Sequence, residues 1–132
     1  MPELFSFDYA VIRIVPRVER EEFLNAGIVL YGATQRFLQA QVEVDKARLA
    51  AFAPWMEIEE IEEHLAAIPL ICKGGKESGP VGLMEQRARF HWLVAPRSTI
   101  VQTSPAHSGM AHNLNEALEH LMNCMVRLPE SK

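Results

Sequence analysis

The sequence predicts an α+β domain: a mostly antiparallel sheet of about five strands, with two or three helices on one face. Three observations support this prediction. An apolar run over residues 5–15 is typical of a central strand, because it is apolar on both sides. Residues 37–44 alternate between apolar and polar side chains, as a half-buried strand does. Two later segments, 57–68 and 113–127, carry apolar residues at helical spacing.

The predicted strands come mainly from the first third of the chain. The run over 5–15 ends at Pro16, and a second short strand over 26–31 closes at Gly32. Short links between these strands and the one over 37–44 favour an antiparallel meander. Two further short strands are expected at 89–94 and 98–103, separated by a break at Pro96.

Three helices are predicted, over residues 45–53, 57–68 and 113–127. Asp45 is a suitable N-cap for the first, and Pro69 is expected to kink or end the second. Either Asn113 or Asn115 can cap the last helix. Glu116, Glu119 and Asn123 are expected to face solvent. The predicted inner stripe of this helix consists of Leu114, Leu118, Leu121, Met122 and Met125.

The length of 132 residues suits one domain, and the contents of 48% hydrophobic and 23% charged residues are ordinary for a globular protein. Residues 73–80 combine glycines, lysines and a proline, which predicts an exposed, flexible loop within this domain. The acidic run over 57–63 is interpreted as the solvated face of a helix.

The formal net charge of −4 argues against a global attraction to nucleic acid. Residues 73–112 nevertheless carry a local charge of 5 − 2 = +3. The N-terminal residues do not resemble a signal peptide, and the apolar stretch over 66–72 is too short to span a membrane. We therefore expect a soluble cytoplasmic protein in which Cys72 and Cys124 are free thiols.

The five histidines show no spacing typical of zinc ligands, so no metal and no cofactor are predicted. No serine lies in a nucleophile motif such as GxSxG, which favours a protein that is not an enzyme. The most informative stretch is instead 89–109, which is richer in polar side chains than a core strand needs.

If a small-molecule site exists, the sequence places it in the segment from Arg97 to His107. Arg97 follows a proline bend, where its guanidinium group and neighbouring hydroxyls suit a phosphate or carboxylate. Arg13 interrupts the central strand and needs a carboxylate partner or an anionic ligand. The candidate ligand-binding residues are Arg13, His91, Arg97, Ser98, Thr99, Gln102 and His107. In the alternative interpretation, Arg97 pairs with a carboxylate of the acidic helix, and the hydroxyls fill turns.

Several stretches together resemble the bacterial domain-of-unknown-function family 3037. They are Tyr9-Ala10-Val11-Ile12-Arg13-Ile14-Val15-Pro16, the segment 20–30 (REEFLNAGIVL), and then 45–54, 64–72 and 89–109 in the same order. The resemblance covers residues 8–127. The family has no established activity, so it supplies no catalytic residues. Proteins similar to this family are often encoded beside a HipA-type kinase, which implies such a kinase as a partner.

Three functions are consistent with these observations. The first is a non-enzymatic binding or regulatory module for a protein partner, for which a HipA-type kinase is one candidate. The second is a domain that binds or hydrolyses a small anionic ligand, such as a phosphometabolite or nucleotide, through the segment from Arg97 to His107. The third is a module that contacts nucleic acid, which the acidic net charge disfavours.

Overall fold

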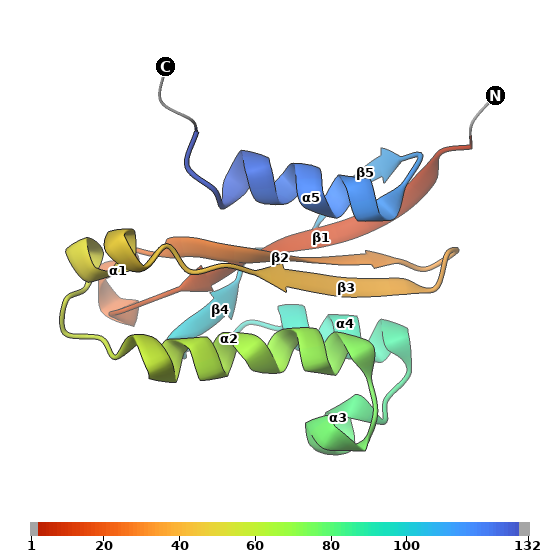
Figure 1. Cartoon of the computed structure of the whole chain (residues 1–132). Coiled ribbons are helices and arrows are strands. Elements are labelled where there is room, and N and C mark those ends of the chain that lie inside the picture. Colours follow the sequence, from red (N-terminus) through yellow and green to blue (C-terminus); the bar gives the residue numbers. More distant parts are fainter. Residues whose placement is uncertain (1–2, 130–132) are drawn as a thin grey trace.

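Residues 3–129, described by a computed structural model, contain five strands that form one antiparallel sheet. The order across the sheet is β3-β2-β1-β4, and β5 pairs with the other half of β1 on the same side as β4 (Figure 1). The α+β class and the number of strands are therefore confirmed. The strands are β1 (Phe5–Ile14), β2 (Leu24–Gly32), β3 (Phe37–Val42), β4 (Val101–Thr103) and β5 (His107–Ala111).

Five α-helices accompany the sheet, more than the two or three that were predicted. They are α1 (Lys46–Phe52), α2 (Ile58–Lys73), α3 (Gly79–Gly82), α4 (Gln86–Val94) and α5 (Leu114–Met125), with 3-10 turns η1 (Val18–Arg20) and η2 (Lys76–Ser78). The prediction that helices cover one face is wrong. Helix α5 lies on one face of the sheet, and α2 and α4 lie on the other (Figure 1). None of the helices described is long and apolar enough to cross a membrane.

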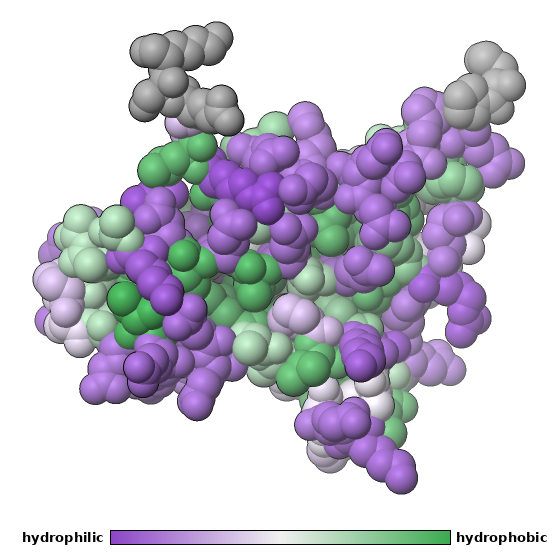
Figure 2. All heavy atoms as spheres, viewed as in Figure 1, coloured by the Kyte–Doolittle hydropathy of each residue, from purple (hydrophilic) through white to green (hydrophobic). Residues whose placement is uncertain are grey.

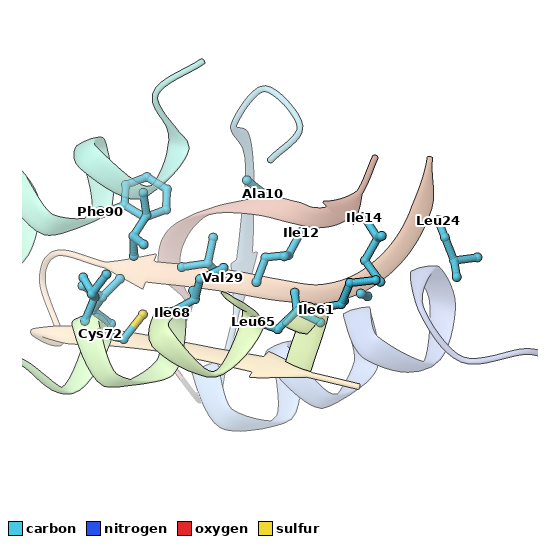
Figure 3. Close-up of a cluster of buried hydrophobic side chains, with 14 of the residues drawn as sticks. Ala10, Ile12, Ile14, Leu24, Val29, Ile61, Leu65, Ile68, Cys72 and Phe90 are labelled. Atoms are coloured by element: carbon cyan, nitrogen blue, oxygen red, sulfur yellow. The ribbon is translucent and has the colours of Figure 1, made fainter. Parts of the chain in front are cut away.

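Both faces are covered because β1 is apolar on both sides. Ala10, Ile12 and Ile14 belong to the core on the α2 side, where Figure 3 shows them with Ile61, Leu65 and Ile68. Phe7 and Val11 belong to a second core beneath α5. This arrangement confirms that β1 is a buried central strand, since each face of the sheet must exclude water.

Two predicted helix caps are present. The Asp45 carboxylate accepts a hydrogen bond from the Arg48 amide at 3.1 Å, and the Asn113 side chain accepts one from the Glu116 amide at 3.1 Å. Asn113 rather than Asn115 is therefore the cap of α5.

The buried side chains of α5 differ slightly from the predicted ones. Leu118 is buried, Leu121 is partly buried, and Met122 is fully enclosed. Met125 is 36% exposed, so the prediction that it packs onto the sheet is wrong. The three side chains expected in solvent, Glu116, Glu119 and Asn123, are exposed.

The strand predicted over 89–94 is instead part of α4. Phe90 and Leu93, three residues apart, are both buried, which is helical spacing. Arg89 also donates hydrogen bonds to the carbonyls of Ile71 at 2.8 Å and Cys72 at 2.6 Å, close to the end of α2. Aromatic and β-branched residues suggested a strand, but tertiary contacts select the helix. The fifth strand is β5, which was not predicted.

Residues 73–80, predicted to be a flexible loop, contain η2 and the start of α3. The Gly75 amide donates to the Gly82 carbonyl at 2.9 Å, and a Cβ on Gly82 would lie 2.1 Å from the Gly75 oxygen. Only glycine fits this contact. Pro69 lies inside α2, which continues to Lys73, so the helix does not end at the proline.

Candidate functional site

The sheet separates the predicted site residues into groups. In the β1–β4 register, Gln102 lies opposite Arg13, so both belong to the sheet face covered by α5. His107 lies opposite Tyr9 on that face, with ring centroids 5.5 Å apart. Arg97 and Thr99 instead border a groove on the α2 side. The seven residues therefore do not surround one cavity.

Four of the seven, Arg13, His107, His91 and Ser98, do not contribute to this groove. His91 is exposed on α4, where its ring lies 6.1 Å from that of Phe90. Ser98 is also exposed, in the connection between α4 and β4. Neither side chain lines the groove.

Arg97 forms hydrogen bonds with the carbonyl groups at the C-terminal end of α4. Its guanidinium group donates to the carbonyl oxygens of Leu93, at 3.2 Å, and of Trp92. The same group lies 4.1 Å from the centroid of the Trp92 ring, a cation–π contact. These bonds favour the structural interpretation of Arg97, although its partners are helix carbonyls rather than the carboxylates considered above.

Thr99 and Gln102 form local hydrogen bonds at the start of β4. The Thr99 hydroxyl donates to the Val101 carbonyl at 2.7 Å, and the Gln102 amide donates to the Thr99 carbonyl at 2.9 Å. Their polar groups are thus partly used within the segment itself, as the alternative interpretation expects.

Arg13 has an aromatic rather than an acidic neighbour. Its guanidinium carbon lies 3.9 Å from the centroid of the Phe23 ring. Its Nε atom is buried and has no hydrogen-bond partner within residues 3–129. The predicted carboxylate partner of Arg13 is not found in that part of the chain.

A groove of about 250 Å³ lies between α2, α4 and β4. Most of its walls are apolar side chains, and no acidic residue lines it. Its lining residues are His64, Ala67, Ile68 and Ile71 from α2, Trp92 and Leu93 from α4, and Arg97, Thr99, Ile100, Val101, Gln102 and Thr103. Sequence reasoning missed the α2 and α4 walls, because residues 89–94 were interpreted as a strand.

The groove follows the edge of β4. Val101, Gln102 and Thr103 all line it, although successive side chains of a strand point to opposite faces. Only the open edge of the strand can present three consecutive residues to one groove. The Ser104 amide donates to Val11 at 2.8 Å and the Ile100 carbonyl accepts from Val15 at 2.7 Å, so these even-numbered positions face β1.

The backbone groups of Val101 and Thr103 consequently point away from β1. In the described part of the chain, no other strand pairs with this side of β4. The Thr103 hydroxyl is also buried there without a hydrogen-bond partner within residues 3–129. The groove thus offers apolar walls beside the outward amide of Val101 and the outward amide and carbonyl of Thr103. The Val101 carbonyl already accepts from the Thr99 hydroxyl.

A break at Ser104 and Pro105 separates this edge from β5. The Ser104 hydroxyl accepts from the Val11 amide and donates to the Pro105 carbonyl, each at 2.9 Å. Residues 101–111 contain no Asp, Glu, Lys or Arg, the charges that usually protect an edge strand. The break keeps both edge segments short, and only β4 lies beside the groove.

Comparison with known protein families identifies the family of this chain. It matches the family described as Protein of unknown function (DUF3037) over residues 9–126. This chain belongs to the DUF3037 family. No curated protein and no solved structure matches it. The DUF3037 match runs from β1 to the end of α5, so the groove and the β4 edge both lie within the region that defines the family.

Few side chains of the DUF3037 groove are titratable. His64 is its one histidine, and its Nε2 atom lies 3.9 Å from a Glu60 carboxylate oxygen. Cys72 lies outside the groove, where burial raises the pKa of its thiol to about 12, so it is a poor nucleophile. Across residues 3–129, no three His, Cys, Asp or Glu side chains are arranged to hold a metal ion.

Proposed function

We propose that this DUF3037 domain is a non-enzymatic module that binds an extended, apolar segment of a partner protein along β4. The observation that carries this proposal is the groove beside an unpaired strand edge. An added strand would satisfy the outward amide of Val101 and the outward amide and carbonyl of Thr103, while its alternate side chains enter the groove. This is β-strand addition, a common mode of peptide recognition.

The composition of the groove indicates which segment fits. Its walls include Ile68, Ile71 and Leu93, which favour aliphatic side chains. Trp92 is 40% exposed, and its contact with Arg97 steadies it as a rigid wall. Arg97 lines the groove and no carboxylate does, so an acidic residue beside the apolar ones is favoured. This preference arises from the positive charge of Arg97 and not from its donors, which bond to helix carbonyls. A HipA-type kinase is one partner that could supply such a segment.

Paired variants of α2 test the groove. Ala67 lines the groove, whereas its exposed neighbour Ala66 does not. Ala67→Trp should fill the groove and abolish binding of an aliphatic-acidic peptide selected from a displayed library, as measured by calorimetry. Ala66→Trp adds the same side chain to the same helix and should bind as wild type. Equal affinity of both variants for the peptide would refute the proposal that the peptide binds in the groove.

A second pair tests the strand edge in the same titration. Thr103→Pro removes an outward amide without removing a bond to β1, so it should prevent strand addition. Thr103→Val keeps that amide and should retain the affinity. Circular dichroism of each variant verifies the fold. Unchanged peptide affinity in a folded Thr103→Pro protein would show that the peptide does not add to β4.

The structure gives less support to a small anion bound by the segment from Arg97 to His107. Arg97 already donates to two helix carbonyls, and His107 belongs to the opposite face of the sheet. A melting-temperature screen with nucleotides, phosphosugars and dicarboxylates checks this alternative. An anion that stabilises wild type but not Arg97→Ala would favour it over the partner-binding proposal.

A further inference from the structure

We propose that a second hollow, at the other end of α4, is a binding site for a phosphoryl group. It has a volume of about 410 Å³ and lies between the β2–β3 turn and the start of α4. Its lining residues are Tyr31, Ala33, Arg36, Glu85, Gln86, Arg87 and Arg89. The local positive charge predicted over residues 73–112 does not include Arg36, which the fold brings to this hollow.

The charge of this hollow opposes that of the whole protein. Three arginines line it against one carboxylate, that of Glu85, although the chain has a formal net charge of −4. Lys73 lines an adjoining recess together with Arg36. None of these cations forms an ion pair with another residue in 3–129. Clustered cations without carboxylate partners repel one another, and an anion would relieve this repulsion.

Part of the site is rigid before any ligand binds. Arg89 donates from Nε to the Met84 carbonyl at 3.0 Å and from Nη1 to two carbonyls at the end of α2, which leaves Nη2 outside these bonds. The Gln86 amide donates to the Arg36 carbonyl at 2.8 Å and joins the β2–β3 turn to α4. The Tyr31 ring stacks on Phe90 with centroids 5.2 Å apart and forms a wall.

The remaining donors suit a phosphoryl group. Arg36 and Arg87 are exposed, so their guanidinium groups can reach a ligand over the fixed Arg89. Helix α4 begins beside the hollow, and Glu85 at its N-cap makes no side-chain capping bond to the first amides. Forked guanidinium donors and free helix amides together match the several oxygens and the double charge of a phosphoryl group.

Titration with pyrophosphate tests the site at constant ionic strength. Wild type should bind pyrophosphate, and the Arg36→Gln/Arg87→Gln double variant should bind at least tenfold more weakly, since each lost charged hydrogen bond costs about that factor. The control is Arg17→Gln/Arg20→Gln, which removes two exposed arginines at the other end of β2. An equal loss in the control, or no binding that exceeds that of chloride, would overturn the proposal.

A second set of titrations identifies the source of the phosphoryl group. A phosphoserine peptide that binds more tightly than free phosphoserine indicates a phosphorylated protein, whereas a phosphosugar or nucleotide that outcompetes both indicates a metabolite. Either result supports the phosphoryl site. The proposal is overturned if the phosphoserine peptide, free phosphoserine and the phosphosugar or nucleotide all fail to bind. Ala67→Trp should leave these affinities unchanged, so the groove proposal can fail without affecting this one.

Discussion

Ser104 shows how one side chain shapes the open edge of the sheet. It is 2% exposed, and its hydroxyl receives the Val11 amide from the central strand. The hydroxyl thus takes the place of a backbone carbonyl as the acceptor for the Val11 amide, at the point where Pro105 interrupts the strand. The sequence around it lacks a nucleophile motif, and its contact with Val11 gives it a structural role.

Removing the Ser104 hydroxyl should destabilise the protein. Ser104→Ala leaves the Val11 amide buried without a partner, which costs about 1–3 kcal/mol. Ser98→Ala is the matched control, because Ser98 is exposed six positions earlier and lies outside the sheet. Urea denaturation of both variants measures the difference in free energy of unfolding. Equal stabilities would mean that water replaces the hydroxyl at Val11.

At the scale of elements, helical periodicity identified α5 and most of its buried stripe, but it wrongly included Met125. The pattern of leucines and methionines fits several orientations of the helix. The sheet selects the one that encloses Leu114, Leu118 and Met122. The cap at Asn113 was predictable because capping depends on neighbours in the chain. The exposure of Met125 was not, because it depends on how α5 packs on β1 and β2.

Truncation of Met122 should therefore lower the free energy of unfolding more than truncation of Met125. Met122→Ala creates a cavity under the helix and should cost about 2–5 kcal/mol. Met125→Ala should cost less than about 1 kcal/mol, since Met125 is 36% exposed. Guanidinium denaturation followed by circular dichroism compares the two substitutions. A larger loss of stability for Met125→Ala would show that α5 is rotated so that Met125, rather than Met122, faces the sheet.

For the whole molecule, the two cores share one sheet. Ile12 faces the α2 side and Val11 faces the α5 side, so loss of either helical layer exposes β1. In the view of Figure 2, apolar residues follow the sheet between α5 and α2, with hydrophilic residues on either side. Such sharing joins both layers into one cooperative unit.

Unfolding should consequently be a single transition. Trp92 belongs to α4 and Trp55 to the connection between α1 and α2, whereas far-ultraviolet circular dichroism also reports α5. Thermal curves from tryptophan fluorescence and from circular dichroism should coincide. An earlier fluorescence transition would show that the α2–α4 layer unfolds independently of α5.

The sequence by itself determined the features that depend on nearby residues. These are the central strand, the alternating edge strand β3, the capped helices α1 and α5, and the membership of the DUF3037 family. Each arises from a local pattern of apolar spacing or from a cap within a few positions.

Only the tertiary structure decided the features that join distant segments. It made 86–94 a helix through the contacts of Arg89 with α2, and it paired β5 with the start of β1. It also placed Arg13 and Arg97 on different faces of the sheet and brought Arg36 beside Arg87. Such juxtapositions depend on how layers pack, which local periodicity does not encode.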